Sequence, residues 1–307
     1  MKKRGECSIT QFFYLNLRTL IFIRKMKQLK FLMVAFTLLM GVSLTSCLNS
    51  DNDYAPSVGG LVKVGDSMFG NSFTMLDGVT KISPTAASLA TLESNMGFKP
   101  SSTNIAYVTG TYDETLNSNL IEDKEYKSVN LLWAVSLDAK VEITERGAEN
   151  DSVNKAPVID IDNSSQMGYE MEKKLHKPWF FYDKTTLILP INYFVYKAGA
   201  HKFTLVYYPE ENADGNKTLK LYLKHYDADD KSTNTNSLNN SGAYPQIYYY
   251  AYNLRGVFSQ YSRMTGEMPT TVTVEYVTNA NSLKLEDAET KTCEVEVKGI
   301  NESTTDK

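Results

Sequence analysis

The chain has 307 residues, with 32 lysines and arginines against 36 aspartates and glutamates, and a formal net charge of −4 at pH 7. This slightly acidic balance argues against a nucleic-acid partner, because the sequence has no basic stripe to meet phosphate groups. Of its three cysteines, only Cys293 lies beyond residue 47. The folded part of the chain therefore lacks a cysteine pair, and we expect its stability to come from core burial.

The N-terminal region contains the parts of a secretory signal. A basic stretch at residues 25–30 precedes an uncharged apolar run at residues 31–44, and both are typical of signal peptides. The run falls short of the roughly 20 apolar residues that a membrane-spanning helix requires. We therefore predict a signal peptide over residues 26–46. Because Met26 begins a complete signal, we interpret residues 1–25 as an extension upstream of the true start; an additional N-terminal anchor helix is the alternative.

Residues 44–47, Leu-Thr-Ser-Cys, resemble the lipobox of bacterial lipoproteins. The resemblance implies that the Cys47 thiol is acylated, that the chain is cut just before it, and that a short tether follows over residues 47–57. Several acyl chains hold a protein on a membrane far more firmly than one chain does. Leu48 and Asn49 stand where lipoproteins retained at the inner membrane have aspartate, which implies the outer membrane of a Gram-negative bacterium. Whether the protein faces the periplasm or the cell surface stays open.

Beyond the tether, the composition is of the β type, with 20 tyrosines and many Thr, Val and Asn residues. Short alternating segments between turn residues predict a first β domain over residues 58–145, as a small barrel or sandwich. Asp77-Gly78 is a strong tight-turn signal between two of its strands, and a helical turn is expected over residues 86–93. Its predicted strands are 60–64, 72–76, 79–82, 104–112 and 128–144, the last with a turn near Leu137-Asp138.

A second β domain is predicted over residues 166–299, after a linker at 146–165 that loses the alternation and contains charges, Gly and Pro. Residues 300–307 are expected to form a disordered tail. Pro190, inside an apolar run, predicts an edge strand or a bulge. Strands joined by loops rich in Asn, Asp and Gly are typical of an antiparallel β-sandwich. The predicted strands are 186–196, 201–208, 218–225, 248–258, 271–277 and 292–297.

Two parts of the chain resemble the NigD-like lipoprotein family. Residues 73–82, Phe-Thr-Met-Leu-Asp-Gly-Val-Thr-Lys-Ile, are similar to the family's strand, Asp-Gly turn and strand. Residues 201–206 and 219–225, separated by an acidic loop, are similar to its paired strands that end in a basic residue and His. With the lipobox, the resemblance covers most of residues 26–299. It implies an all-β chain with an N-terminal OB-like barrel and a C-terminal antiparallel β-sandwich; a link to bacteriocin production or immunity rests on the family's name alone.

One set of residues is a candidate metal or acid–base site. His201, His225 and Asp227 flank successive predicted strands and would lie close together if those strands pair. We favour the alternative, in which they are polar residues at strand ends that hydrogen-bond to turns. The sequence contains no Gly-x-Ser-x-Gly elbow, no phosphate-binding glycine loop and no Cys-x-x-Cys pair. We therefore expect a non-enzymatic protein with no catalytic residues, no cofactor and no metal.

A tyrosine cluster next to a long polar loop is the best candidate for a binding surface. Tyr248, Tyr250 and Tyr252 point to one face of their predicted strand, with Tyr244 nearby. Exposed rings can stack on sugars or anchor a protein partner; the alternative, which we favour slightly, is that most of these rings bury against the opposing sheet. Two functions stay open. One is a binding or structural role in the cell envelope through a protein partner, and the other is glycan binding through the tyrosine-rich face.

Three further expectations concern single residues. Asp151-Ser152-Val153 in the linker resembles the Asp-Ser/Thr-aliphatic O-glycosylation sites of some Gram-negative groups, which makes Ser152 a candidate for modification. Trp133 and Trp179 are expected in the core. Cys293 alternates with glutamates on a strand and is expected to be a small buried residue rather than a reactive thiol.

Overall fold

The computed structural model describes residues 55–67, 70–147, 154–195, 201–227 and 243–300. The expectations for the signal peptide, the lipidated Cys47, the modified Ser152 and the tail after residue 300 lie outside these ranges. Residues 55–307 belong to one compact unit. No helix in the described ranges is long and apolar enough to cross a membrane.

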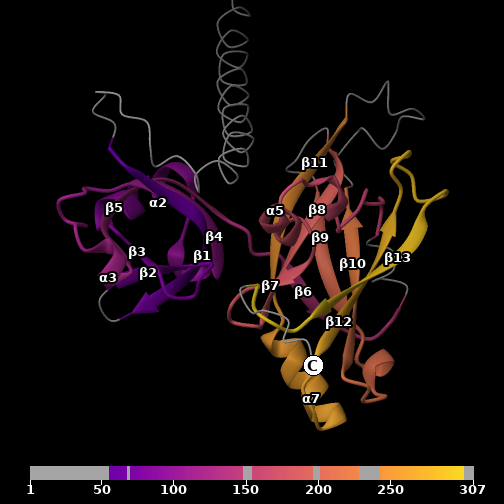
Figure 1. Cartoon of the computed structure of the whole chain (residues 1–307). Helices are drawn as coiled ribbons and strands as arrows, with labels where there is room; N and C mark the ends of the chain where they lie inside the picture. The colour runs from indigo at the N-terminus through magenta and orange to yellow at the C-terminus, as the bar shows by residue number, and fades with distance from the viewer. Residues whose placement is uncertain (1–54, 68–69, 148–153, 196–200, 228–242, 301–307) are drawn as a thin grey trace, which may run out of the picture. The chain divides into compact units, whose positions relative to one another are not determined.

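A closed barrel of five strands forms the N-terminal part of this unit (Figure 1). Its strands follow the order β1-β2-β3-β5-β4, in which β3 and β5 run parallel. A small five-stranded barrel of this kind, with a helix between β3 and β4, confirms the predicted OB-like domain. Its elements are β1 (Ser57–Ser67), β2 (Gly70–Met75), β3 (Lys81–Pro84), α2 (Ala86–Met96), η1 (Pro100–Ser102), β4 (Ile105–Thr111), α3 (Leu120–Asp123) and β5 (Glu125–Ser136).

The predicted Asp-Gly turn connects β2 to β3. Gly78 adopts a φ of 73°, which glycine reaches without strain. Asp77 Oδ1 accepts hydrogen bonds from the backbone N–H groups of Val79 and Thr80 at 2.9 and 2.8 Å. Because these two N–H groups bond to the aspartate, β3 begins at Lys81, later than the predicted return strand at residue 79.

Helix α2 is longer than the helical turn predicted over residues 86–93. Thr85 Oγ1 accepts a hydrogen bond from Ser88 N at 3.2 Å and caps the N-terminus. The helix ends at Gly97, which adopts a φ of 71°. Leu92 is buried and packs into the barrel core.

Two glycines allow the barrel to close. A Cβ atom at Gly59 would lie 2.7 Å from Val108 O, and one at Gly110 would lie 2.7 Å from Asn130 O. Real Cβ atoms essentially never come so close, so any larger side chain would push neighbouring backbone apart. Next to Gly110, the register between β4 and β5 shifts. The extra residue of this bulge is Leu132, whose side chain is exposed.

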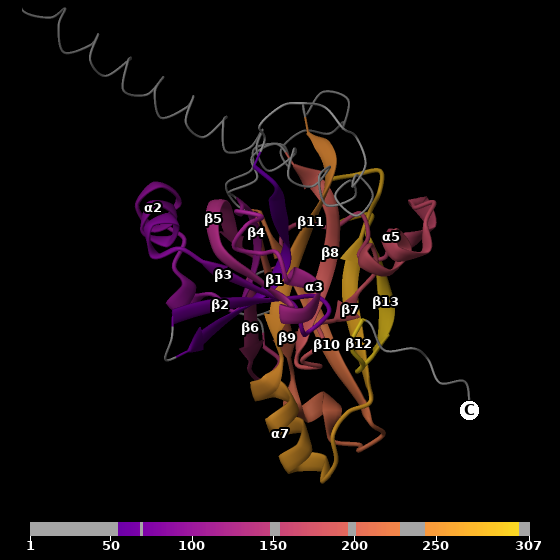
Figure 2. The same cartoon turned by 60° about the vertical axis from the view of Figure 1, so that its left-hand side comes forward.

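Two sheets form the C-terminal domain and confirm the predicted sandwich (Figure 2). One has the order β13-β12-β10-β9-β6, and the other has the order β11-β8-β7. Alternate residues of both sheets meet in one core, among them Leu189 of β8, Leu205 of β9 and Leu221 of β10. The elements are β6 (Lys140–Ile143), η2 (Ser164–Gln166), α5 (Glu170–Leu175), β7 (Trp179–Phe180), β8 (Thr186–Val195), β9 (Lys202–Tyr207), η4 (Pro209–Asn212), β10 (Thr218–Tyr226), β11 (Tyr244–Asn253), α7 (Arg255–Thr265), β12 (Thr271–Thr278) and β13 (Glu289–Glu296).

Two strand pairs in the larger sheet are parallel, although we predicted antiparallel pairing. β10 pairs with β12, and β6 pairs with β9, in the same direction. Parallel neighbours need a long crossover between them. Between β10 and β12 the chain passes through β11 of the other sheet and through α7. Between β6 and β9 it passes through β7 and β8 of the other sheet.

The segment predicted over residues 128–144, with a turn near Leu137-Asp138, is two strands that lie in different sheets. β5 ends in the barrel, and β6 begins in the sandwich. Between them, Asp138 accepts hydrogen bonds from the backbone N–H groups of Asn104 and Ile105 at 2.6 and 3.0 Å. Asp138 lies in the predicted turn, where the chain leaves the barrel for the sandwich. Alternation alone does not reveal where a strand changes sheets.

Two further segments differ from their predicted roles. Val158 and Ile161, within the predicted linker, are buried in the sandwich core. The strand predicted over residues 248–258 ends at Asn253, and α7 begins two residues later. Phe258 and Tyr261 are spaced for one face of a helix, and both are buried.

Pro190 lies in a strand with neighbours on both sides and not at a sheet edge. β8 pairs with β11 along its length but with β7 only at Leu187 and Ile188. Pro190 therefore lies beyond the end of β7, where no strand needs the N–H group that proline lacks. Its carbonyl accepts a hydrogen bond from Asn163 Nδ2 at 3.0 Å.

The tryptophans and the cysteine expected in the core differ in burial. Trp179 is buried, whereas Trp133 is half-buried and meets Tyr107 edge-on at a centroid distance of 5.6 Å. Cys293 is half-buried, and its burial raises the pKa of the thiol to about 11. The thiol is therefore protonated at neutral pH, which agrees with an unreactive residue.

Replacing Gly110 by Ala should destabilise the protein, because the new Cβ atom meets the backbone of Asn130. Overpacking of this kind costs about 1–3 kcal/mol. Urea unfolding followed by circular dichroism measures the loss. Gly256→Ala is the control, since the nearest atom to its Cβ would be 4.0 Å away. Equal stability of the two variants would contradict the role of Gly110 in closure.

Candidate functional site

The tyrosine cluster on β11 faces the core of the sandwich. Tyr248, Tyr250 and Tyr252 lie opposite residues of β8 that belong to the core, namely Ile191, Leu189 and Leu187. Residues opposite each other in a ladder share one face of the sheet. Tyr252 is fully buried, so the prediction that it contacts a ligand is corrected. Tyr248 and Tyr250 are half-buried against the core, and Tyr244 is half-buried at the start of the strand.

The other face of β11 is also covered. Tyr249 is buried, and its hydroxyl lies 3.4 Å from His176 Nε2. His176 follows helix α5, and its Nδ1 donates to Glu172 O at 2.9 Å. Neither face of the strand therefore presents a row of open rings to solvent.

The structure brings His201 and His225 together, as predicted, but inside the protein. His201 Nδ1 lies 2.8 Å from His225 Nε2, and both residues are buried. His225 Nδ1 lies 3.1 Å from Pro157 O, and a carbonyl only accepts, so this nitrogen carries the proton and Nε2 accepts from His201. The His225 ring also stacks on Phe203 at 4.3 Å. These two nitrogens thus hydrogen-bond to each other and do not face a site for a metal ion.

Asp227, the third member of the predicted set, is buried at the end of β10. It lines an open hollow with Lys155 and Tyr226 and does not complete a metal site with the histidines. Among the residues that the structure describes, no group of three or more His, Cys, Asp or Glu side chains could hold a metal ion.

A second candidate site lies at one end of the barrel, on the connection from β4 to β5. We call residues 113–124 the rim loop. Asn117 is buried within it, donates to Asp113 O at 2.8 Å and Lys127 O at 3.2 Å, and accepts from Lys127 N at 2.7 Å. One buried amide thus ties both ends of the loop together. Leu116 and Ile121 are held outward, with 57% and 82% of their surface exposed.

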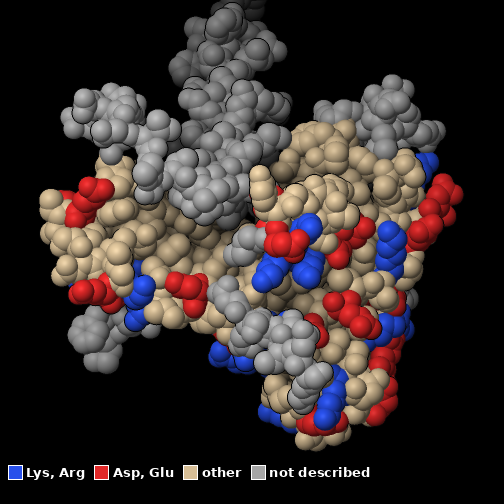
Figure 3. Space-filling model, viewed as in Figure 1, with Lys and Arg blue, Asp and Glu red and all other residues tan. Residues whose placement is uncertain are grey.

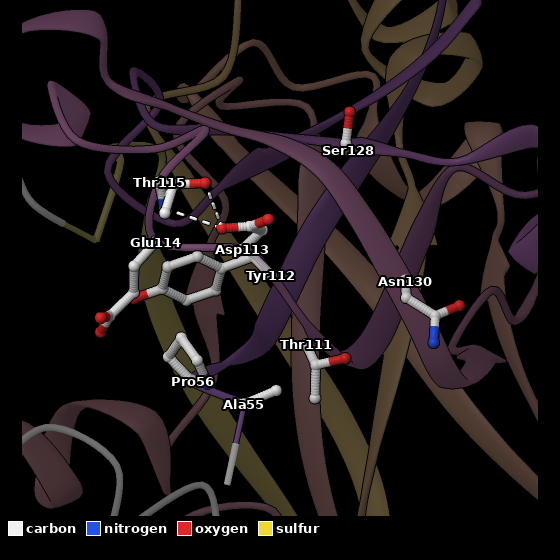
Figure 4. Close-up of a pocket in the computed structure, with 9 residues that line it drawn as sticks. All are labelled: Ala55, Pro56, Thr111, Tyr112, Asp113, Glu114, Thr115, Ser128 and Asn130. Atoms are coloured by element: carbon white, nitrogen blue, oxygen red, sulfur yellow. Dashed lines mark hydrogen bonds between the residues drawn. The ribbon is translucent and has the colours of Figure 1, made fainter. Parts of the chain in front are cut away.

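An open hollow of about 590 Å³ adjoins the rim loop (Figure 4). Its lining comes from the residues just before β1, from the end of β4 with the first residues of the connection that follows it, and from β5, which the closed barrel brings together. We call this the rim hollow. It is lined by Ala55, Pro56, Thr111, Tyr112, Asp113, Glu114, Thr115, Ser128 and Asn130.

Polar side chains without a structural role line one side of the rim hollow. Thr111 and Asn130 are opposite each other in the β4–β5 ladder, so they share the outer face of the barrel. Ser128 lies two residues before Asn130 on β5. Within the described ranges, the side chains of these three residues form no hydrogen bond to the protein. Their donors and acceptors are available to a ligand.

The other side of the rim hollow has an aromatic ring and a carboxylate. Tyr112 is half-buried and meets Tyr126 edge-on at a centroid distance of 5.0 Å, which fixes its ring. Asp113 accepts from Thr115 N at 2.8 Å and Thr115 Oγ1 at 2.7 Å. Hydrogen bonds from the Thr115 hydroxyl, the Thr115 N–H and the Leu116 N–H lower the pKa of Asp113. The carboxylate is therefore ionised and oriented at neutral pH.

The surface shown in Figure 3 has acidic and basic side chains interspersed over the sandwich. That face offers no extended basic stripe of the kind that binds nucleic acid. In the described part of the chain, the lining of the rim hollow includes the carboxylates of Asp113 and Glu114 and no Lys or Arg.

The rim hollow was not identified from the sequence. Its polar residues on β5 alternate with the buried Val129 and Leu131, and such alternation indicates only a solvent-facing side of a strand. Pro56 and Thr111 are far apart in sequence, so only barrel closure places them at one site. The exposed Leu116 and Ile121 were a weak signal, because single exposed aliphatic residues are common.

Solved structures with a similar fold match most of this chain. A candidate lipoprotein of Bacteroides fragilis is 24% identical, with a TM-score of 0.61, over 79% of this chain and 99% of that one. A protein of unknown function from Bacteroides vulgatus matches with 12% identity and a TM-score of 0.43, over 78% and 90% of the chains. A NigD-like immunity protein of Bacteroides caccae matches with 14% identity and a TM-score of 0.42, over 79% and 94%.

No family model and no curated protein match the chain. The likeness to the Bacteroides fragilis protein shows that the barrel and the sandwich occur together elsewhere.

Replacing Asn117 by Ala should loosen the rim loop, because it leaves the Lys127 N–H and two carbonyls without their partner. The loss of a buried hydrogen-bonding group costs about 1–3 kcal/mol. Amide hydrogen exchange measures this as faster exchange at Lys127. Asn119→Ala is the matched control, since Asn119 makes no side-chain capping bond. Unchanged protection at Lys127 would contradict the role of Asn117.

Proposed function

We propose that this protein is a non-enzymatic lipoprotein, anchored in the outer membrane through Cys47, with a binding role in the cell envelope. Its binding surface is the rim of the barrel, formed by the rim loop and the rim hollow. The observation that carries the proposal is the rim itself: a loop fixed by the buried Asn117 holds out side chains that the fold does not use. Side chains held in place without structural partners are characteristic of binding surfaces.

The position of the rim along the chain supports this role. The rim hollow is lined by Ala55 and Pro56, which lie at the end of the predicted tether of residues 47–57. Residues 47–55 form so short a segment that even a fully extended chain spans at most roughly 30 Å. A lipid on Cys47 would therefore keep the rim close to the membrane surface, where envelope partners and glycans are found.

The barrel rim is a better candidate than the tyrosine-rich strand of the sandwich. Tyr252 is fully buried, and Tyr248 and Tyr250 pack against the core. Their rings stabilise the sandwich and have little surface left for a partner. The rim residues differ in character: among the described residues that line the hollow, Tyr112 alone packs against the barrel core, and the polar side chains contribute little to it.

Replacing Cys47 by Ser should release the protein from the membrane, since the acyl chains provide the anchor. We expect the variant in the soluble fraction after cell lysis, without incorporation of a labelled fatty acid. Cys293→Ser is the matched control, and it should stay in the membrane fraction with its label. Fatty-acid labelling of the Cys47→Ser variant would contradict lipidation at this residue.

A photo-cross-linking residue in place of Ile121 should form a discrete adduct in living cells, because this side chain is 82% exposed on the rim loop. Immunoblotting detects the adduct as a shifted band. The same residue in place of Met268, which is 54% exposed in the sandwich, is the control. No adduct from position 121, or the same adduct from both positions, would contradict the rim as a binding surface.

A further inference from the structure

We propose that the rim hollow binds a neutral carbohydrate. This inference rests on the proposed binding role of the rim and names the class of ligand. It follows from three properties of the lining: free hydroxyl and amide groups, one oriented aromatic ring, and negative charge without positive charge.

The polar groups match the needs of a sugar. Each sugar hydroxyl donates and accepts hydrogen bonds, so a site for it must offer both kinds of partner at short spacing. The Asn130 amide provides donors and an acceptor, and the hydroxyls of Thr111 and Ser128 provide both. Asp113 adds an ionised acceptor, held in place by Thr115. Hydrogen bonds to a charged acceptor are among the stronger ones available to a hydroxyl.

The ring of Tyr112 supplies the second element of sugar recognition. A pyranose presents C–H groups on one face, and these pack on an aromatic ring while the hydroxyls at the edge reach polar groups. Tyr112 is only half-buried, and the edge-on contact with Tyr126 restricts its rotation. Figure 4 shows Tyr112 and Asp113 side by side in the lining of the hollow, with Asn130 across from them on β5.

The negative charge of the lining favours a neutral ligand over an anionic one. Among the residues that the structure describes, the carboxylates of Asp113 and Glu114 line the hollow, and no lysine or arginine does. A phosphate, sulfate or carboxylate on the ligand would be repelled, and no cation would offset that repulsion. A peptide is also a poor fit, because the apolar lining is limited to Ala55, Pro56 and Tyr112 and lacks a deep pocket for an anchoring side chain.

The backbone at Ser128 adds an independent observation. Ser128 has a φ of 56°, in the left-handed region that favours glycine. It lies where the ladder between β3 and β5 shifts register. A non-glycine residue in a strained conformation at a binding surface suggests that its side chain has a use. Ser128 is among the residues that line the rim hollow, and its side chain bonds to no other described group, so ligand contact is such a use.

The test uses the full-length protein, purified in detergent, on an array of neutral, sulfated and sialylated glycans. We expect binding to one or more neutral glycans and none to their sulfated or sialylated counterparts. Calorimetry with a neutral glycan that binds then gives dissociation constants for the variants. Asn130→Ala should weaken binding about tenfold, the loss expected for hydrogen bonds of one amide. Asn95→Ala, an exposed asparagine on α2, is the control and should bind like the wild type.

Ser128→Gly separates binding from folding. Glycine adopts the φ of this position more easily than serine, so thermal unfolding should occur at the same or a higher temperature. The same variant should bind the neutral glycan several-fold more weakly, because it lacks the hydroxyl.

Three results would overturn the proposal: no neutral glycan binds, charged glycans bind better, or Asn130→Ala binds as tightly as Asn95→Ala. If the cross-link from position 121 persists in any of these cases, only the ligand class is wrong. If it is also absent, the binding role of the rim is wrong as well.

Discussion

Close backbone packing at two glycines is the constraint on which the barrel depends. At Gly59 and Gly110 a neighbouring carbonyl oxygen lies only 2.7 Å from where a Cβ atom would be, so β1, β4 and β5 approach more closely than side chains would allow. This approach brings the residues just before β1, the end of β4 with residues 112–115, and residues 128–130 of β5 to one end of the barrel. The rim hollow is formed from these three segments, and its polar outer surface is therefore a direct result of how the barrel closes.

Local chemistry explains which parts of the fold are predictable from sequence. The Asp77-Gly78 turn depends on bonds to residues two and three positions away. The clean alternation over residues 218–225 is likewise visible in the sequence and places Leu219 and Leu221 in the core. Strand partners are a different matter. β6 pairs with β9 in parallel, although the chain passes through another sheet between them. This pairing depends on non-local packing that no short segment encodes.

For the candidate sites too, local features were predictable from the sequence and non-local ones were not. A period of two reveals that Tyr248, Tyr250 and Tyr252 share a face, but only their register with β8 places that face inside the sandwich. The pairing of His201 with His225 was predictable, because they flank adjacent strands; their burial was not, since it depends on rings from elsewhere in the chain, such as Phe203. The rim hollow escaped prediction because each of its segments has the pattern of an ordinary surface strand or loop.

The edge strand β6 has a consequence for how the chain folds. β6 precedes the predicted linker, yet it covers one edge of the larger sheet by pairing with β9. Before β6 pairs with it, β9 exposes a row of unpaired backbone N–H and C=O groups, and such an edge can pair with a strand of another chain. A second copy could donate its own β6 there, which is the geometry of domain swapping. Asp138 fixes the short connection from β5 to β6, and β6 then pairs with β9 of its own chain, which leaves that edge closed to a strand from a second copy.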